Sequence, residues 1–409
     1  MARLDKLIEE LCPHGVEYVE LKNISQLLNG YAFKSNRYSK EGIRVIRISD
    51  VQKGSISNKD LKFYSEDSIE DIQRYLLKEN DLVMSLTGNV GRIAMILNKH
   101  LPAALNQRVV CIKVNEEKVL NRFLFHFFDQ DSFENIAMRN STGGGQKNLS
   151  TTWLGNFSIP LPPLPVQEEI VRILDNFTEL TAELTAELTA RKKQYEYYRD
   201  ELLTFGDEVE WKTLGEVGEL IRGSGLQKKH FRAEGVPCIH YGQIYTYYGT
   251  FADETISFVT KEHSKKLRKA QKGDVLISGV SENIEDICTP LGWFGDDVCI
   301  SGDMFAFRHN QNTKYITYLL KTTDFSRYKE RYAHGAKVTR LSRDRLLEYK
   351  IPIPPLAEQE RIVSILDKFD ALVNDISIGL PAEIEARQNQ YEYYREKLLT
   401  VKELNSNEA

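Results

Sequence analysis

Basic side chains interleaved with amides are the residues of this chain whose types could do the most selective chemistry. Eight lysines and arginines lie within the 25 residues from Lys321 to Arg345, among few acidic residues. Arginine can donate two parallel hydrogen bonds to the edge of guanine, and asparagine or glutamine can pair with adenine in the same way. The mixture suits the major groove of double-stranded DNA, and an equally common alternative is a charged surface that meets only water.

The candidate DNA contacts are basic, amide and aromatic side chains from both halves of the chain. The first half contributes Arg37, Arg47, Asn89, Arg92, Asn106, Gln107, Arg108, Gln146 and Lys147, and the second half contributes Tyr241, Gln243, Asn283, Lys337, Arg340 and Arg343. A tyrosine such as Tyr241 could stack on a base, although filling the face of a sheet is its commoner use.

Motifs of catalytic and cofactor-binding sites are missing from the sequence. It contains no G-x-x-x-x-G-K-[ST], H-E-x-x-H or G-x-S-x-G, and no N-P-P-[FYW] or D-P-P-Y motif of amino-methyltransferases. The triplet Gly143-Gly144-Gly145 could cradle a phosphate, but a lone glycine triplet more often marks a flexible loop. We therefore expect no catalytic residue, no metal and no cofactor in this chain.

Composition indicates an ordinary cytoplasmic protein. The net charge is −5, but acidic residues concentrate in two helical segments, which leaves the globular parts weakly basic. The five cysteines form no C-x-x-C motif, so we expect reduced thiols and no zinc site. The sequence has no run of 18 apolar residues and no apolar signal core at its N-terminus.

Two long helical segments must position the candidate residues. From Val166 to Phe205, apolar residues recur at gaps of three and four without glycine or proline, which predicts a helix of about 60 Å. Ile351–Leu372 is identical to Ile159–Leu180 at 14 of 22 positions, and Ala386–Thr400 differs from Ala190–Thr204 at four. The chain is therefore an internal duplication, and its two helical segments are expected to pair as an antiparallel intramolecular coiled coil.

The predicted fold class is α+β, with two pseudo-symmetric mixed α/β domains separated by the two long antiparallel helices. The expected segments are residues 1–158 (first domain), 159–205 (first long helix), 206–350 (second domain), 351–402 (second long helix) and 403–409 (disordered tail). The second helix contains Gly379-Leu380-Pro381, so we expect an interruption near 379–381. The first 12 residues resemble a helix end and are hypothesised to lie where the second long helix ends.

Polar and aromatic residues also recur in both long helices, beyond what an apolar seam requires. We interpret these as contacts for two identical external partners, because tyrosine and arginine are common interface anchors. The predicted subunit-interface residues are Gln167, Glu168, Tyr195, Tyr198 and Arg199 in the first helix, and Gln359, Glu360, Tyr391, Tyr394 and Arg395 in the second.

The near-identical helices share the motifs P-P-L-x-x-Q-x-x-I-V-x-I-L-D and Q-Y-E-Y-Y-R, and the first helix also contains the T-A-E-L repeats. On these motifs the chain resembles the specificity subunit of a type I restriction-modification enzyme. The resemblance is to the branch with TAEL spacers and covers nearly the whole chain. It implies that each domain reads half of a bipartite DNA site. It also implies two methyltransferase subunits bound through the repeated regions, with restriction subunits joining the full complex, and with methyl donor, ATP and magnesium on those partners.

Two alternatives stay open at this point. The chain could be a stand-alone DNA-binding scaffold or adaptor without catalytic partners. A fused nuclease or methyltransferase is a third possibility, which the missing motifs disfavour.

Overall fold

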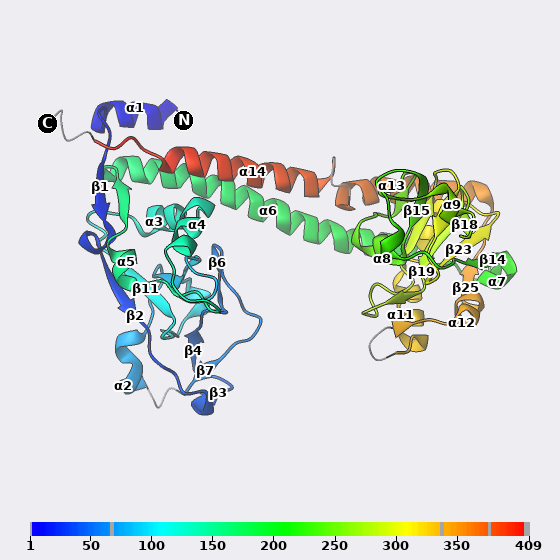
Figure 1. Cartoon of the computed structure of the whole chain (residues 1–409), viewed down its shortest axis with the longest axis horizontal. Helices are drawn as coiled ribbons and strands as arrows, with labels where there is room; N and C mark the ends of the chain where they lie inside the picture. Colours follow the sequence, from blue (N-terminus) through cyan, green and yellow to red (C-terminus); the bar gives the residue numbers. More distant parts are fainter. Residues whose placement is uncertain (1, 66–68, 336–338, 375–377, 405–409) are drawn as a thin grey trace. The chain divides into compact units, whose positions relative to one another are not determined.

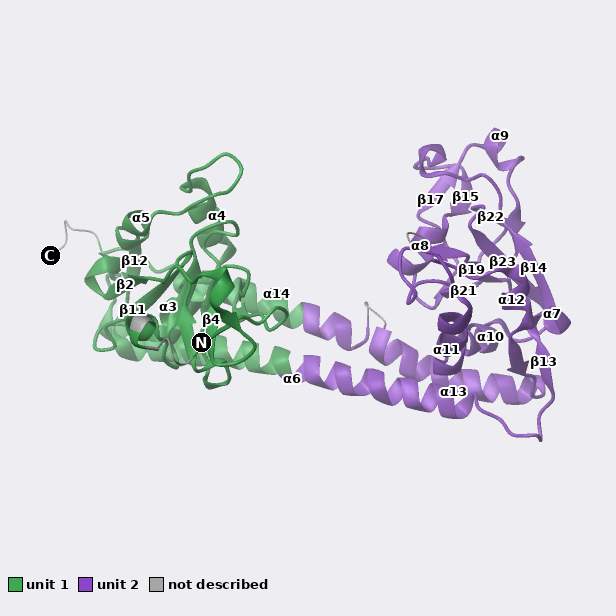
Figure 2. Ribbon diagram, turned by 90° about the horizontal axis from the view of Figure 1, so that it is seen from below, with its two compact units in different colours: residues 1–182, 386–409 green, residues 183–385 purple. Residues whose placement is uncertain are grey.

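The computed structural model describes residues 2–65, 69–335, 339–374 and 378–404. The chain divides into two compact units, shown in different colours in Figure 2. Unit 1 comprises residues 1–182 and 386–409, and unit 2 comprises residues 183–385. Each unit therefore contains one globular part together with a portion of both long helical segments, whereas the expected bounds set the helices apart.

Two four-stranded sheets form the frame of unit 1. The first has the antiparallel order β2-β11-β8-β9, and the second has the order β10-β4-β7-β3 with β10 and β4 parallel. Valine, isoleucine and leucine dominate these strands, as buried strands require. Their bounds are β2 (Ser25–Asn29), β3 (Tyr38–Ser39), β4 (Ile43–Ile46), β7 (Phe63–Tyr64), β8 (Leu82–Ser85), β9 (Ile93–Met95), β10 (Ala103–Leu105) and β11 (Val109–Val114). Two-stranded pairs join β1 (Glu17–Glu20) to β12 (Ser158–Leu161) and β5 (Val51–Gln52) to β6 (Ser55–Ile56).

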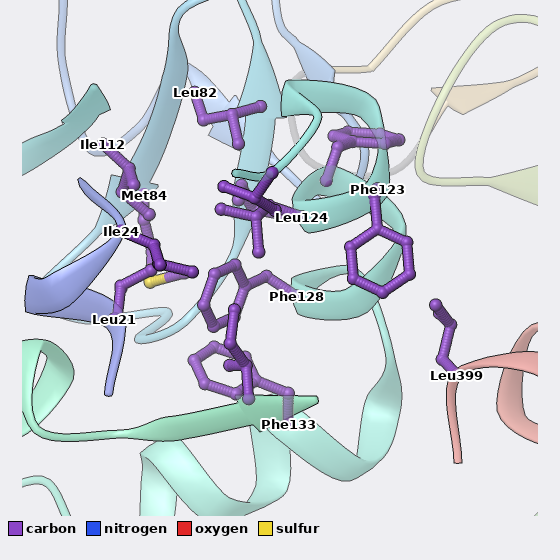
Figure 3. Packing of buried hydrophobic residues seen from close by; sticks show 14 of the residues in the cluster. Leu21, Ile24, Leu82, Met84, Ile112, Phe123, Leu124, Phe128, Phe133 and Leu399 are labelled. Atoms are coloured by element: carbon purple, nitrogen blue, oxygen red, sulfur yellow. The ribbon is translucent and has the colours of Figure 1, made fainter. Parts of the chain in front are cut away.

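The helices of unit 1 complete its core. The α-helices of its globular part are α1 (Ala2–Leu11), α2 (Ile69–Ile72), α3 (Asn121–Phe128), α4 (Asp131–Arg139) and α5 (Thr151–Gly155), and short 3-10 turns include η2 (Ser35–Arg37). Phe123 and Phe128 of α3 pack with Leu82, Met84 and Ile112 of the first sheet (Figure 3). Burial of these large apolar side chains is the main term that stabilises the unit.

Unit 2 repeats this frame with different side chains. Its larger sheet has the order β14-β23-β19-β21-β16, and its smaller sheet has the order β17-β15-β22-β18. The strands are β13 (Trp211–Thr213), β14 (Gly218–Arg222), β15 (Val236–Ile239), β16 (Phe251–Ala252), β17 (Ser257–Val259), β18 (Lys269–Ala270), β19 (Val275–Ser278), β20 (Val280–Ser281), β21 (Pro290–Trp293), β22 (Val298–Ile300), β23 (Met304–His309), β24 (Thr339–Arg340) and β25 (Lys350–Pro352). The helices are α7 (Leu214–Val217), α8 (Tyr241–Thr246), α9 (Lys261–Ser264), α10 (Thr313–Leu319), α11 (Thr323–Tyr332) and α12 (Arg343–Glu348), with the 3-10 turn η6 (Lys228–His230).

Strand pairing confirms that the two globular parts are duplicates. The parallel pair β4 with β10 in unit 1 corresponds to the parallel pair β15 with β22 in unit 2. The antiparallel neighbours β7 and β17 occupy the same place beside them. The mixed α/β character and the pseudo-symmetry predicted from the sequence are therefore present.

One uninterrupted helix, α6 (Leu164–Leu202, 39 residues), belongs to both units. In unit 1 its first part lies beside α14 (Leu380–Leu399), and in unit 2 its last part lies beside α13 (Leu356–Asn374) (Figure 1). The second long segment is thus two helices, and α14 begins one residue before Pro381, a residue suited to a first turn. Residues 375–377 lie outside the described residues.

The chain ends meet in unit 1, as hypothesised from the sequence. The N–H of Val16 donates to the carbonyl of Lys402 at 2.9 Å, and the N–H of Leu404 donates to the carbonyl of Val16 at 3.0 Å. Leu4 of α1 is buried in the same core cluster as Leu399 of α14. The expectation of a disordered tail is therefore wrong for residues 403 and 404, and residues 405–409 lie outside the described part.

Candidate nucleic-acid interface

Four loops of unit 1 are joined by hydrogen bonds into one surface, which we call the loop cluster of unit 1 (residues 30–33, 86–91, 105–108 and 142–149). Gln107 N–H donates to the carbonyl of Tyr31 at 2.9 Å, and Leu86 N–H donates to the carbonyl of Arg108 at 3.1 Å. The hydroxyl of Thr87 donates to the Asn148 side chain at 3.0 Å. These bonds bring residues that are far apart in the sequence to one face.

Unit 2 has the same arrangement, the loop cluster of unit 2 (residues 223–226, 279–283, 301–304 and 334–343). The parallel bridge between Tyr31 and Asn106 in unit 1 is repeated between Ser224 and Ser301. The antiparallel bridge between Thr142 and Asn148 is likewise repeated between His334 and Arg340. Asn148 and Arg340 therefore occupy the same position in the two clusters.

The loop cluster of unit 2 is hollowed and basic. One pocket of about 330 Å³ is lined by Arg222, His334, Arg340 and Arg343, together with the carboxylate of Asp303. An adjoining pocket of about 480 Å³ shares Arg222 and Asp303 and adds Arg268. Guanidinium groups around a hollow of this size can reach phosphates or base edges, because arginine presents several donors in one plane.

Eight of the predicted DNA contacts lie in the two loop clusters with exposed or half-buried side chains. They are Asn89, Asn106, Gln107, Arg108, Gln146 and Lys147 in unit 1, and Arg340 and Arg343 in unit 2. The tertiary structure thus assembles these residues on one face of each unit, which their separation in the sequence did not establish.

Four further predicted contacts, Arg47, Arg92, Gln243 and Asn283, have side chains that are engaged in hydrogen bonds within their own unit, and their contact with DNA stays a prediction. Arg47 pairs with Asp50 and Asp60, and Arg92 pairs with Glu134. Gln243 donates to the hydroxyl of Ser257 at 2.8 Å, and both amide atoms of Asn283 bond to Asp286. A side chain that already holds a loop in place would have to break those bonds to read a base.

The remaining three predicted contacts have other surroundings. Arg37 is exposed on η2, where its guanidinium lies 5.4 Å from the centroid of the Tyr64 ring. Tyr241 is half-buried beside the loop cluster of unit 2, and its N–H donates to Ser301 at 3.0 Å. Lys337 lies outside the described residues.

Arg222, Arg268 and Asn148 belong to the site but were not among the predicted contacts. Arg222 is the last residue of strand β14 and is followed by Gly223, just as Asn29 is the last residue of β2 in unit 1 and is followed by Gly30. Asn148 could have been predicted, because an alignment of the two repeats places it at the position of Arg340, which was a predicted contact. Arg268 has no sequence signal, because tertiary contacts with Ser224 and Arg222, residues far away in the sequence, bring it there.

The repeated glutamines of the long helices are buried, and their side chains hydrogen-bond the start of each helix to its globular part. The Gln167 amide accepts from Leu120 N–H at 2.9 Å and donates to the carbonyls of Lys118 and Pro162 at 3.0 and 2.8 Å. Gln359 makes the same kind of contacts at its own helix start, and both side chains are 0% exposed. Their recurrence therefore comes from packing of the helix on the globular part.

A second buried polar contact ties the long helices to each unit. In unit 1, His126 lies 2.8 Å from Asp175 of α6 and 3.0 Å from the hydroxyl of Tyr391. Burial lowers the pKa of His126, against the opposing effect of its hydrogen bond with Asp175. In unit 2 the equivalent contact is the hydroxyl of Tyr318, which donates to Asp367 of α13 at 2.8 Å.

The predicted subunit-interface residues divide by burial. Gln167, Gln359, Tyr195, Arg199 and Arg395 are buried, Tyr391 and Tyr394 are half-buried, and Glu168, Glu360 and Tyr198 are exposed. At the five buried positions the side chains face the inside of their unit, so a direct partner contact there stays a prediction that the fold does not favour. Tyr197 and Tyr393, which the prediction omitted, are 62% and 60% exposed. Their place off the apolar stripe was the sequence signal for this outward direction.

The family of the chain follows from two matches along its length. Residues 13–191 and 206–386 each match the model of the type I restriction modification DNA specificity domain. The chain belongs to this family. One such domain therefore lies in each of the two repeats.

Curated relatives of this specificity protein are themselves specificity subunits. The EcoR124I/EcoR124II subunit of Escherichia coli is 40% identical over 268 residues, which cover 61% of this chain and 65% of the relative. The putative subunit S.HindORF215P of Haemophilus influenzae is 37% identical over 307 residues, 69% and 73% of the two chains. The EcoprrI subunit of E. coli is 30% identical over 406 residues and 92% of each chain. The match to the EcoR124I/EcoR124II subunit, at 65% of its length, spans less than two thirds of that relative.

Two solved structures share the fold of this specificity protein. A chain from a structure of type I R-M system assembly and conformational transition aligns with a TM-score of 0.63 at 17% identity, over 95% of this chain and 98% of the other. The type I S subunit from M. genitalium aligns with a TM-score of 0.53 at 14% identity, over 94% and 96%. At these identities the likeness shows a shared fold alone.

Two further properties concern the described residues as a whole. No cluster of three or more His, Cys, Asp or Glu side chains is arranged to hold a metal ion there. None of the helices in that part of the chain has the length and apolarity that crossing a membrane needs.

Proposed function

We propose that this chain is the sequence-recognition subunit of a type I restriction-modification complex, in which each unit reads one half of a bipartite, asymmetric DNA site. The observation that carries the proposal is the duplicated loop cluster with unlike side chains at matching positions. Asn148 in unit 1 and Arg340 in unit 2 are the clearest pair. One scaffold with two chemically different faces suits two different base sequences.

The long helices set the distance between the two half-sites in this proposal. Helix α6 runs through 39 residues without interruption and contributes to both units. A continuous helix is a stiff spacer, because each residue adds a fixed rise of about 1.5 Å. The length of α6 would therefore fix the number of unread base pairs between the half-sites.

Two identical methyltransferase subunits would dock on the exposed faces of the repeated Q-Y-E-Y-Y-R segments, and restriction subunits would join the full complex. Glu196 and Tyr197 in unit 2 recur as Glu392 and Tyr393 in unit 1, and all four side chains are exposed. Identical exposed residues on two otherwise divergent units are what two copies of one partner require. Exposed tyrosine beside glutamate suits a partner surface with apolar pockets and basic residues.

The chain itself would be non-catalytic. The absence of nucleotide-binding and methyltransferase motifs from the sequence supports this part of the proposal. The methyl donor, ATP and magnesium would then belong to the partner subunits. The chain would contribute selective DNA binding and subunit assembly.

Methylome sequencing of a host that carries the chain with its partners tests the proposal. We expect one bipartite methylated sequence, and in the Arg340→Ala variant we expect relaxed recognition of one half-site only. Arg327→Ala, an exposed arginine on α11 outside the loop clusters, is the matched control. Loss of recognition in both halves, or no effect of Arg340→Ala, would contradict the assignment of one half-site to each unit. Purification without any methyltransferase subunit would favour a stand-alone DNA-binding adaptor.

A further inference from the structure

Unit 2 carries a second basic surface, outside its loop cluster, which we call the basic surface of unit 2. It consists of two segments, residues 227–232 around η6 and residues 261–268 around α9. Together they contain seven lysines and arginines and one glutamate. The seven basic residues, all with exposed side chains, are Lys228, Lys229, Arg232, Lys261, Lys265, Lys266 and Arg268.

The two segments of this surface lie side by side. Arg232 N–H donates to the carbonyl of Phe258, in the strand that leads into α9, at 2.8 Å. The rings of His230 and His263 are in contact, with centroids 4.1 Å apart. The lysines on either side of these contacts therefore present their charges on neighbouring loops.

The basic surface also adjoins the loop cluster of unit 2. Arg268 donates from its backbone N–H to Ser224 at 2.7 Å and from its guanidinium to the carbonyl of Arg222 at 3.1 Å. Arg222 and Arg268 line one pocket. Basic residues thus extend from the hollow at Arg340, past the carboxylate of Asp303, to the lysines of η6 and α9.

These charges are not neutralised within the described part of the chain. Across residues 2–65, 69–335, 339–374 and 378–404, none of the five lysines of the surface forms an ion pair with a carboxylate. Five unpaired ammonium groups on adjacent loops repel one another, so the folded unit gains nothing from their concentration. A polyanion that binds there would release its own counterions and relieve the repulsion.

Unit 1 shows that the fold does not require this charge. Strands β7 and β17 are equivalent, and the buried Ile72 and Leu267 follow them at the same distance. Between these anchors, unit 1 has the sequence S-E-D-S-I-E-D-I, with four acidic residues and no basic one, where unit 2 has T-K-E-H-S-K-K-L. Residues 66–68 lie outside the described part and enter this comparison by sequence alone. At this segment the same frame therefore carries opposite charge in the two units, whereas residues 34–39, the counterpart of residues 227–232, keep two basic residues, Lys34 and Arg37.

We propose that the basic surface of unit 2 binds the phosphate backbone of the DNA duplex next to the half-site that this unit reads, and that the acidic segment of unit 1 equivalent to residues 260–267 makes no such contact. The inference rests on the proposed function. Lysine on a flexible stem is a sequence-independent partner for phosphate, whereas the arginines of the hollow can also address base edges. Unit 2 thereby supplies the larger share of the sequence-independent affinity.

The test compares the chain, in complex with its methyltransferase subunits, with a variant carrying Lys228→Ala, Lys229→Ala, Lys265→Ala and Lys266→Ala. Dissociation constants for a duplex with the recognised site and for a scrambled duplex are measured over a range of salt concentrations. We expect both affinities to fall by similar factors, and the slope of log K against log salt to lessen by about 0.9 for each phosphate that the variant no longer neutralises. The methylated sequence should stay the same.

The matched control replaces the same four lysines by arginine, which keeps the charge and should keep affinity and slope. Because all four side chains are exposed, both variants should melt like the parent chain. An alanine variant with parental affinity and slope would overturn this inference and leave the proposed function standing. A changed methylated sequence would also overturn it, because the surface would then read bases. Failure of the parent complex to prefer its own site would instead overturn the proposed function.

Discussion

Arg395 of α14 donates a hydrogen bond of 2.7 Å to the carboxylate of Asp129, and both side chains are buried in unit 1. In unit 2 the duplicated positions hold two cations, Arg199 and Lys321. Arg199 pairs there with its neighbour Asp200 at 2.9 Å. The opposite charges that tie the helix to the globular part in unit 1 are thus replaced by like charges in unit 2.

Removal of Arg395 should therefore destabilise unit 1 strongly. Arg395→Ala leaves the Asp129 carboxylate buried without its partner, which costs about 3–5 kcal/mol. Arg199→Ala is the matched control, and its cost should be smaller, because Asp200 is 31% exposed and stays hydrated without Arg199, and because Lys321 loses a like-charged neighbour. Urea unfolding followed by segment-resolved hydrogen exchange measures both variants. Equal losses of stability in the two variants would contradict this account.

Asp129 also makes the stability of unit 1 depend on pH. Burial raises the pKa of Asp129 from its ordinary 3.8 to about 6, although the charge of Arg395 opposes the shift. Since the folded state keeps a proton that the unfolded state loses, the contribution of Asp129 to stability is full below pH 4 and is lost as pH rises through about 6. The difference in unfolding free energy between the parent and Asp129→Asn, measured across that range, should change with pH. A constant difference would show that Asp129 titrates normally.

Gln167 should matter for folding and not for partner binding. Gln167→Ala strands the N–H of Leu120 and the carbonyls of Lys118 and Pro162, each of which costs about 1–3 kcal/mol when buried without a partner. Glu168→Ala, at the exposed neighbouring position, is the control and should leave stability unchanged. Chemical denaturation distinguishes the two. A Gln167→Ala chain that folds with parental stability but no longer binds methyltransferase subunits would contradict this account and would support a direct partner contact at Gln167.

A four-residue deletion in α6 should change spacing without changing recognition. Removal of Thr185–Leu188 shortens the helix by about 6 Å, which is close to two base pairs of about 3.4 Å each. We expect methylome sequencing to show both half-sites unaltered and their separation shortened by about one or two base pairs. Replacement of the same four residues by alanine keeps the length and should keep the spacing. Altered half-sites at unaltered spacing would rule out the spacer role of α6.

The exposed tyrosines should carry the docking of partner subunits. Tyr197→Ala should remove one methyltransferase subunit, and the double variant with Tyr393→Ala should remove both, because truncating a central aromatic anchor costs more than about 2 kcal/mol of binding. Native mass spectrometry counts the bound subunits. Tyr247→Ala, at the end of α8 and 63% exposed, is the matched control. Full occupancy in the double variant would move the docking site elsewhere.

The sequence by itself determined the duplication, the long helices and the two recognition domains. Each rests on a local or repeated signal, such as the spacing of apolar residues from Ile170 to Leu202 or the recurrence of Q-Y-E-Y-Y-R. It also singled out eight residues that lie in the loop clusters, because amides and basic residues in loops are visible without a fold.

Only the tertiary structure decided which polar residues are available. Arg47 and Arg108 are the same residue type in similar loops, yet Arg47 is held by Asp50 while Arg108 is exposed. Repetition in sequence likewise does not tell a buried residue from an exposed one. Gln167 recurs in the second repeat as a buried residue that hydrogen-bonds to the globular part, whereas Tyr197 recurs as an exposed residue. The physical reason is that burial and hydrogen bonding depend on residues far away in the chain, such as the carbonyls and N–H groups of residues 118–120 that surround Gln167.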